Sequence, residues 1–420
     1  MIDIKYLREH KDEVRDNCVA RRSDADIDEV LMIDEKYTKL LQETEGIRAE
    51  RNENAKKAKQ GKPDPSLIEE GKKLKSLLAE KDEALKILEK ERETMIRAIP
   101  NLTHPEAPKG ESDEDNAVLR EVGKINKISD AKDHTELAKI HDLIDFERGA
   151  KVSGAKHYFL KNKLAVLEQA LIRYGIDFAI KEGFEFLATP DLAREEILMG
   201  KGFLPRGPEK QVYYIEGEDL ALIGTAEITV LGYHMNEVLK KDEVPKKYVA
   251  FSHCFRTESG AYGRESYGLY RVHQFAKVEM FAFAAPEQSE ALHLEFLAHE
   301  EKFWQSLGIP YRVVDCVTGD LGGSDYRRYD IEAWMWGKND GQGGYGEVTS
   351  CSNCWDYQSR GLQIKYEDEN GDKKFVHTLN GTVVATPRAL LAILENFQQE
   401  DGSIKIPEVL VPYCGFEKIG

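Results

Sequence analysis

Charged residues stand at both ends of a segment that is typical of a long β-hairpin. Arg256 and Glu258 follow the apolar run 248–251, and the returning alternating run 272–281 carries Glu279. Because Arg256 and Glu258 share strand parity, we expect both side chains on one face. An Arg–Glu pair on a hairpin is most often a solvated surface pair, so the hairpin alone does not indicate a site.

A hydroxyl and a carboxylate two residues apart form a second candidate. Thr225 and Glu227 follow a short strand-like run at 220–223. On one face, the two side chains could hold an ammonium group. Capping of a helix N-terminus by Thr225 is the structural alternative.

The segment Glu347-Val348-Thr349-Ser350 offers oxygen ligands at the end of a predicted strand. Strict alternation would place Glu347 and Thr349 on one face, and Val348 and Ser350 on the other. Carboxylate and hydroxyl oxygens suit Mg²⁺, which combines a few protein oxygens with substrate phosphates.

Arg388 lies directly after Pro387, at the predicted start of a helix over 387–399. A cation is disfavoured there by the helix dipole, whereas proline fits the first turn. Such an arginine is better explained if an anion such as a phosphate docks beside it.

The six cysteines are scattered, with only Cys351 and Cys354 close together. A structural zinc site needs four ligands, and neither a second Cys pair nor a His-x₃₋₅-His accompanies this one. We therefore expect no zinc, and reduced thiols in a cytoplasmic protein.

Two heptad repeats indicate the element that precedes these segments. The first runs from Val30 to Ala58 and the second from Leu67 to Ile99, with the helix-breaking GKPDPS at 61–66 between them. The pattern predicts an antiparallel coiled-coil hairpin over about 29–99, on the order of 50 Å long.

The tip of this hairpin is basic although the chain carries a net charge of −17. Between positions 56 and 75 the tip has only three acidic residues but seven lysines: Lys56, Lys57, Lys59, Lys62, Lys72, Lys73 and Lys75. A solvated coiled-coil face would account for them. A basic tip on an acidic protein favours an anionic partner.

A proline-bearing, acidic linker at 100–115 separates the hairpin from the rest of the chain. We expect an N-terminal helical domain over 1–105 and a second domain over 106–420. After an amphipathic helix around 164–178, short strands dominate without a βαβ rhythm, which predicts an α+β fold with an antiparallel sheet flanked by helices. No apolar run is long enough to span a membrane, and the charged N-terminus is no secretory signal.

Taken together, these segments resemble the bacterial seryl-tRNA synthetases, which are class II aminoacyl-tRNA synthetases. Pro190 resembles the proline of motif 1. The segment FRTES…RVHQFAKVEMF resembles motif 2, and the segment LNGTVVATPRALLAILENFQ resembles motif 3. The arm, the IDFERGAKVSGAKHYFL segment and GEVTSCSNCWDYQSR extend the resemblance over the whole chain.

The resemblance implies a serine–tRNA ligase that forms seryl-adenylate from ATP and charges the 3′-terminal adenosine of tRNA(Ser), and of tRNA(Sec) where that exists. It implies Arg256, Glu279 and Arg388 as catalytic residues. The implied ATP site comprises Arg256, Thr257, Glu258, Val272, Phe275, Glu347, Val348, Thr349, Ser350 and Arg388. Thr225, Ala226, Glu227, Arg256, Glu279 and Thr382 are implied to bind serine. Glu347 and Ser350 are implied to hold Mg²⁺ with ATP.

Family members are homodimers, and the arm is implied to lie on the variable arm of the tRNA. Three segments depart from the common pattern: Glu265-Ser266-Tyr267-Gly268 in the motif 2 loop, Thr382 and Pro387 in motif 3, and Gly200-Lys201-Gly202-Phe203 after motif 1. Two alternatives remain: a homologue that loads serine onto a carrier protein, which should lack the arm, and a non-catalytic RNA-binding relative, which should have lost Arg256, Glu279 or Arg388.

Overall fold

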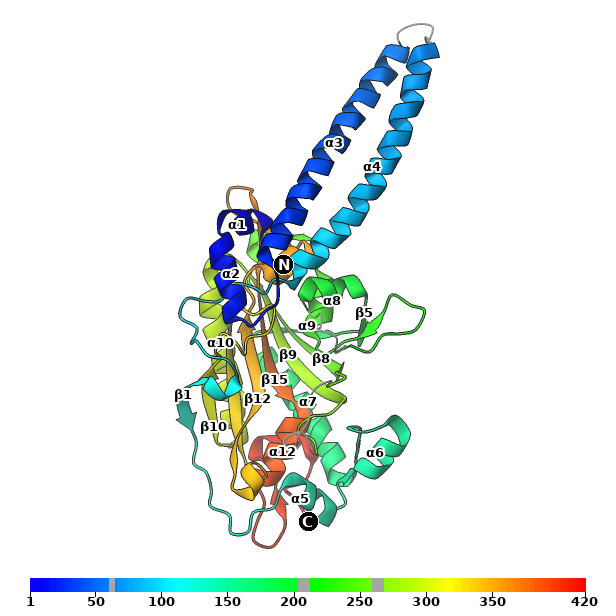
Figure 1. The fold of residues 1–420 in the computed structure, drawn as a ribbon. Coiled ribbons are helices and arrows are strands. Elements are labelled where there is room, and N and C mark those ends of the chain that lie inside the picture. Colours follow the sequence, from blue (N-terminus) through cyan, green and yellow to red (C-terminus); the bar gives the residue numbers. More distant parts are fainter. Residues whose placement is uncertain (60–64, 203–211, 259–267) are drawn as a thin grey trace. The chain divides into compact units, whose positions relative to one another are not determined.

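The structure is a computed structural model that describes residues 1–59, 65–202, 212–258 and 268–420. These residues divide into two compact units, one spanning Ile2–Pro100 and the other consisting essentially of Asn101–Gly420. Figure 1 shows both units. None of the described helices is long and apolar enough to cross a membrane.

The first unit is entirely helical. Its elements are α1 (Ile4–Glu9), α2 (Lys11–Ala20), α3 (Ile27–Lys59) and α4 (Pro65–Ala98). The long helices α3 and α4 pack along each other, as the heptads predict. Predicted seam positions such as Val30, Ile33 and Leu78 are buried, whereas Arg51 is exposed.

A carboxylate fixes the base of this arm. Asp34 is buried and pairs with Arg8 of α1 at 2.6 Å and with Arg92 of α4 at 2.7 Å. Burial works to raise the pKa of Asp34, but hydrogen bonds from the two guanidinium groups outweigh it and the pKa is lowered. One charged side chain therefore ties three helices together.

Polar residues also mark the distal part of the seam. Asn54 is buried and donates a hydrogen bond to Glu70 at 2.9 Å. Gly71 lies opposite, where an added Cβ would stand 3.2 Å from the Asn54 side-chain oxygen. Nearer the base, Arg48 pairs with Asp82 and Lys81 with Glu43 across the two helices.

An eight-stranded sheet organises the second unit, in the order β1-β10-β11-β12-β15-β9-β8-β4. Its strands are β1 (Ala117–Val122), β4 (Glu185–Ala188), β8 (Lys246–Phe255), β9 (Gln274–Ala284), β10 (Tyr311–Asp315), β11 (Arg327–Met335), β12 (Gly344–Asn353) and β15 (His377–Ala385). Every pair is antiparallel except β4 with β8, which is parallel. The predicted antiparallel sheet flanked by helices is confirmed, with this one parallel edge strand as an addition.

Two hydrophobic cores lie on opposite faces of the central strands. Val249 and Met280 point into the larger core, with α7 (Asn162–Lys181), α10 (Ser289–Leu307) and α12 (Thr386–Asn396). Their neighbours Tyr248 and Phe281 point into a smaller core with α9 (Glu227–Tyr233) and α11 (Tyr357–Leu362). Because side chains alternate along a strand, β8 and β9 are covered on both faces.

Shorter elements complete the second unit. They are α5 (His134–Ile140), α6 (Phe146–Ser153), α8 (Glu195–Lys201), α13 (Val411–Cys414), β2 (Ile144–Asp145), β3 (Phe159–Leu160), β5 (Leu192–Ala193), β6 (Ala221–Leu222), β7 (Val238–Leu239), β13 (Lys365–Glu367), β14 (Lys373–Phe375), β16 (Ile404–Lys405) and β17 (Lys418–Ile419). The helices predicted around 164–178 and over 387–399 are confirmed as α7 and α12.

Candidate active site

One pocket opens where β8 ends and β9 begins, over the middle of β12 and beside the N-terminus of α12. The sequence-predicted residues that line it are Arg256, Glu258, Val272, Phe275, Glu347, Val348, Thr349, Ser350, Thr382 and Arg388. Thr257 does not belong to the lining, and Thr225, Ala226, Glu227 and Glu279 lie outside it. The fold thus brings together segments that are more than 100 residues apart.

Arg256 enters the pocket from just beyond the end of β8. Its Nε donates to the carbonyl oxygen of Gly224 at 3.3 Å, and its guanidinium lies 5.4 Å from the centre of the Phe275 ring. The backbone N–H of Arg256 donates to the carbonyl of His273, which keeps the hairpin closed beyond the strand. The side chain is therefore held over the pocket by contacts with Gly224 and with Phe275 of β9.

Glu258 reaches the pocket by a different route from the one predicted. β8 ends at Phe255, and Glu258 has φ of 47°, a left-handed conformation. Its carboxylate lies 3.2 Å from Arg271. The strand-parity argument for Arg256 and Glu258 is wrong, because neither residue lies on a strand, although both line the same pocket.

Arg388 lies in the first turn of α12, after Pro387, as predicted. Its Nη1 is 3.0 Å from Oε1 of Glu347 and 3.0 Å from the Glu347 carbonyl oxygen. Its guanidinium also stacks 4.7 Å from the centre of the Tyr270 ring. The helix N-terminus therefore presents a cation that is fixed by a carboxylate on one side and a ring on the other.

Glu347 keeps its charge among these arginines. Desolvation works to raise its pKa, but the guanidinium groups of Arg388, Arg328 and Arg256 outweigh it, so the pKa is lowered. The side chain is 44% exposed, toward the pocket. Glu347 is thus an ionised carboxylate that faces the pocket.

A β-bulge interrupts β12 next to Glu347. Ile331 pairs with Thr349 and Glu332 with Glu347, so Val348 has no partner in the register. Thr349 donates to Glu300 of α10 at 2.9 Å, whereas Glu347 pairs with Arg388. The alternation expected from the sequence does not hold across the bulge, since Glu347 and Thr349 contact different elements.

A second carboxylate lies behind the pocket. Glu279 is buried, 2.6 Å from Lys277, and accepts a hydrogen bond from Thr382 at 3.0 Å. Burial raises its pKa, and the nearby charge of Glu227 adds to this, although Lys277 works in the opposite direction. Because Lys277 and Thr382 also line the pocket, Glu279 is one contact removed from it.

Glu227 begins α9 and is itself buried among polar groups. Its Oε1 accepts from Gln358 at 2.7 Å and from Asn380 at 3.1 Å, and its Oε2 lies 3.2 Å from Lys201. The hydroxyl of Thr225 accepts from the Glu227 backbone N–H at 3.3 Å. Thr225 therefore also plays part of the capping role that is the structural alternative.

Four residues of this region escaped the sequence analysis as site residues: Lys201, Lys277, Gln358 and Asn380. Lys277 had a usable signal, since a lysine interrupts an otherwise apolar strand and needs a counter-ion. Gln358 and Asn380 had none, because their roles arise only where α11 and β15 meet α9.

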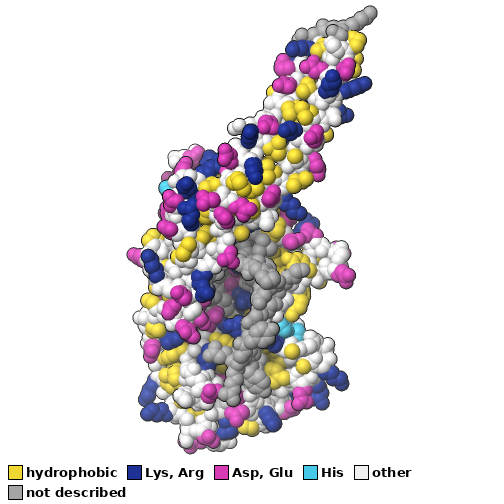
Figure 2. Space-filling view, viewed as in Figure 1, with side chains coloured by type: hydrophobic (Ala, Val, Ile, Leu, Met, Phe, Trp, Pro, Cys, Tyr) yellow, Lys and Arg dark blue, Asp and Glu magenta, His cyan; other side chains and the backbone are white. Residues whose placement is uncertain are grey.

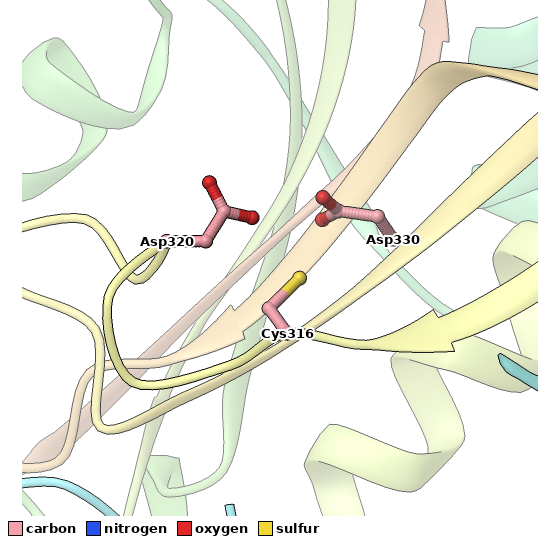
Figure 3. Close-up of side chains that lie close together, drawn as sticks. All are labelled: Cys316, Asp320 and Asp330. Carbon is pink, nitrogen blue, oxygen red and sulfur yellow. The ribbon is translucent and has the colours of Figure 1, made fainter. Parts of the chain in front are cut away.

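A further acidic group lies close to the pocket. Figure 3 shows the side chains of Cys316, Asp320 and Asp330 converging, with ligand atoms within 4.8 Å of one another. Arg328 supplies the positive charge: its Nε is 3.3 Å from Cys316 Sγ and 3.0 Å from Asp330, and its Nη2 is 2.5 Å from Asp320. We interpret the group as an ion-pair network rather than a metal site.

Burial raises the pKa of Asp330 to about 7. Arg328 works to lower it, while the charges of Glu347 and Asp320 raise it further. Asp330 pairs in register with Ser350 of β12, so this carboxyl group borders the predicted metal ligands.

Comparison with known proteins identifies relatives of both units of the chain. A family model for the class II tRNA synthetase core domain (G, H, P, S and T) matches residues 212–397. A model for the seryl-tRNA synthetase N-terminal domain matches residues 1–103. A serine–tRNA ligase of Treponema denticola is 50% identical, with all of both chains covered.

The chain belongs to the seryl-tRNA synthetase family. A second relative, a serine–tRNA ligase of Rubrobacter xylanophilus, is 48% identical over 100% of this chain and 99% of its own. Among solved structures, seryl-tRNA synthetase of Pyrococcus horikoshii, complexed with ATP, has a TM-score of 0.87 and 38% identity, with 100% and 99% of the chains covered. The cytoplasmic serine–tRNA ligase of Naegleria fowleri, in complex with AMP, has a TM-score of 0.82 and 32% identity. The match covers 100% of this chain and 98% of that chain.

The features that mark this seryl-tRNA synthetase family member as unusual lie partly outside the described residues. Of the motif 2 loop segment 265–268, only Gly268 is described, and Lys62 of the arm also falls outside. Lys201 is described, and it occupies the buried position beside Glu227.

The basic residues of the arm are mixed with acidic ones. Lys56, Lys57 and Lys59 end α3, and Lys72, Lys73 and Lys75 lie on α4. Lys56 pairs with Glu53 at 2.8 Å and Lys73 with Glu69 at 3.4 Å. Figure 2 shows the same interleaving of Lys and Arg with Asp and Glu along the arm.

Proposed function

We propose that this chain activates L-serine with ATP and transfers it to the 3′-terminal adenosine of tRNA(Ser). The observation that carries the proposal is the continuous set of polar groups from Glu258 and Arg256, through Lys277, to Glu279 and Thr382. This set offers cations for phosphates at one end and buried carboxylates for an amino acid at the other. Relatives of the same length are named serine–tRNA ligases.

ATP binds in the pocket at the ends of β8 and β9. Arg256 contacts the α-phosphate, Glu258 accepts from the adenine amino group, and Phe275 stacks on the ring. The Val272 backbone touches the base, and Arg388 holds the terminal phosphates. Thr257, Val348 and Thr349 flank the nucleotide. Two solved relatives are complexes with ATP and with AMP, which supports a nucleotide in this pocket.

Glu347 and Ser350 hold Mg²⁺ when ATP is bound. The residues fit the ion, because the lowered pKa of Glu347 keeps its carboxylate charged, and both side chains line the pocket. Carboxylate and hydroxyl oxygens with phosphate oxygens form the ligand set that Mg²⁺ prefers. The bound ion supplies charge neutralisation on the phosphates.

Serine binds behind the nucleotide. Thr225, Ala226 and Glu227 hold its ammonium group, and Arg256 its carboxylate. Glu279 and Thr382 face the serine hydroxyl. Because these polar groups are buried, alanine would leave them without partners, and discrimination on the order of 10⁴-fold is available from this cause alone.

Two bond exchanges complete the reaction. A carboxylate oxygen of serine attacks the α-phosphorus, and the bond to the leaving pyrophosphate breaks. A ribose hydroxyl of the terminal adenosine then attacks the acyl carbon, its proton is lost, and AMP leaves. Arg256 and Arg388 stabilise the charge that develops on the phosphates, while Glu279 helps to fix the amino acid, so positioning and electrostatics carry the catalysis.

The helical domain over 1–105 binds the variable arm of the tRNA, and the domain over 106–420 carries the chemistry. Structured RNA is recognised mostly through phosphates and shape, which suits the lysines of the arm tip. The protein works as a homodimer in the cytoplasm. Exposed apolar side chains beside α7 and the edge strand β4, namely Phe159, Val166 and Phe186, support such an interface.

Serine-dependent exchange of pyrophosphate into ATP by the purified protein tests the activation step. We expect exchange with serine that exceeds exchange with alanine by several orders of magnitude. Charging of tRNA(Ser), tested beside an acyl-carrier protein, separates the proposed ligase from a carrier-loading homologue. Absence of exchange in a preparation with intact secondary structure would overturn the proposal and favour a non-catalytic RNA-binding protein.

A further inference from the structure

Lys201 stands where a substrate cation is expected. It is the last residue of α8, and its ammonium group lies 3.2 Å from Oε2 of Glu227. Both side chains are nearly enclosed, with 14% and 4% of their surface exposed. The other oxygen of Glu227 already accepts from Gln358 and Asn380. The protein's own side chains therefore supply partners for both oxygens of this carboxylate.

This arrangement conflicts with a simple ammonium site at Glu227. Two ammonium groups close to one carboxylate oxygen repel each other, and the repulsion is large in a site shielded from water. If the serine ammonium binds Glu227, as the proposed function requires, Lys201 has to leave Oε2. A buried lysine leaves a carboxylate only if another counter-ion receives it.

The candidate for this second counter-ion is Asp325. Burial works to lower the pKa of Lys201, but Glu227 and Asp325 are among the negative groups that outweigh it, and the pKa is raised. Polar contacts link the two carboxylates: Gln358 donates to both Glu227 and Ser324, and the Cys354 thiol lies 3.8 Å from Asp325 Oδ1. Asp325 is itself buried.

We infer that Lys201 is a mobile counter-ion of the amino-acid site, which occupies the ammonium subsite at Glu227 when no serine is bound and turns to Asp325 when serine enters. The inference rests on the proposed function. It assigns Lys201 and Asp325 as positioning residues that set serine affinity. In either position of Lys201, the trio of Lys201, Glu227 and Asp325 carries one net negative charge, which the ammonium group of serine neutralises locally.

Three variants test the inference through the KM for serine in pyrophosphate exchange. Asp325→Asn removes the second counter-ion, so Lys201 stays on Glu227 and the KM rises about tenfold. Lys201→Met with Asp325→Asn restores one net negative charge and leaves Glu227 open to serine. We expect its KM to fall below the wild-type value by about fivefold, in line with charge-assisted hydrogen bonds of this kind. Lys201→Met alone should also lower the KM.

A fixed structural lysine predicts the opposite order. In that case the double variant would be at least as impaired as Asp325→Asn, because two supports of the site are lost, and this result would overturn the inference. The double variant carries the test if the single Lys201 variant does not fold. The KM for ATP is the internal reference, since neither residue lines the nucleotide pocket. Lys405→Met, at an exposed strand position, is the matched control.

A serine analogue without the ammonium group gives a second readout. 3-Hydroxypropionate, measured as a competitive inhibitor of exchange, does not need Glu227, so its Ki should not fall in the double variant. A parallel fall of its Ki and of the serine KM would show a change of pocket shape and contradict displacement of Lys201. If the wild-type protein shows no serine-dependent exchange, the proposed function is wrong. If the wild type shows exchange but the serine KM of the double variant is at least as high as that of Asp325→Asn, only the inference is wrong.

Discussion

Arg388 and Glu347 bind each other across the pocket, with Nη1 3.0 Å from Oε1. The residue proposed to hold the terminal phosphates and the residue proposed to hold Mg²⁺ are thus paired with each other within the protein. A preformed pair costs little reorganisation when phosphate and cation enter together, because each new charge is matched by one already fixed.

Loss of Arg388 should abolish most of the activation activity. Arg388→Ala is expected to lower kcat/KM for pyrophosphate exchange by about 10²- to 10³-fold, the usual effect of removing one preorganised electrostatic contact. Arg388→Lys keeps the charge without the planar fork and should recover only part of the loss. Arg360→Ala, which breaks a pair with Asp356 away from the pocket, is the control. Equal losses in the Arg388 and Arg360 variants would contradict the assignment.

The free energy of unfolding should depend on pH through Asp330, which belongs to the ion-pair network shown in Figure 3. Its folded pKa of about 7 lies above the usual value for an aspartate, so the folded state binds more protons than the unfolded state between roughly pH 4 and 7. This contribution is present at low pH and is lost as pH rises through 7. Asp330→Asn removes it.

The free energy of unfolding of Asp330→Asn, relative to the wild type, should therefore improve by about 1 kcal/mol for each pH unit between pH 5 and 7. Thermal and urea unfolding of the full chain at both pH values measure this difference. Asp372→Asn, at an exposed position, should show no such trend. A constant offset between Asp330→Asn and wild type would mean that Asp330 stays ionised throughout.

Shortening the arm should separate the two half-reactions. Removal of 48–82, with a short glycine linker, takes away the tip and keeps Arg8, Asp34 and Arg92 at the base. We expect serine-dependent exchange within about twofold of wild type and charging of tRNA(Ser) reduced by at least 100-fold in kcat/KM. Charging at the wild-type rate would refute the role of the arm.

Individual lysines of the arm tip should contribute unequally. Lys56 and Lys73 have carboxylate neighbours, so their replacement by Gln should change tRNA binding less than replacement of Lys57 or Lys72. Each lysine that neutralises a phosphate should reduce the slope of log KM against log salt by nearly one. Charging assays over a salt series measure the slopes. Equal slopes for all variants would place the RNA elsewhere.

The sequence predicted the elements better than their junctions. Heptads and amphipathic periodicity identified α3, α4, α7 and α12, because local spacing determines which helix face is buried. The parity of Arg256 and Glu258 failed because β8 ends at Phe255, and strand ends depend on tertiary contacts. The same holds for the bulge at Val348, which depends on the partner strand.

The candidate site was predicted mainly through motifs that the resemblance supplied. Residues that act through neighbours were missed, and Lys201 is the clearest case. Nothing in the local sequence shows that the last turn of α8 delivers an ammonium group to Glu227, since the contact joins residues 26 positions apart through the packing of α8 on α9. Long-range burial of this kind has no periodic signature.

Asn54, buried opposite Gly71 in the seam of the arm, has a consequence for how far the arm reaches. A slide of one heptad along the partner would bury this amide against apolar positions and separate it from Glu70, and polar residues in such seams penalise shifted pairings. The two helices therefore have one phase relative to each other. Because the two helices cannot slide along each other, the distance between the lysines of the arm tip and the base of the arm is fixed.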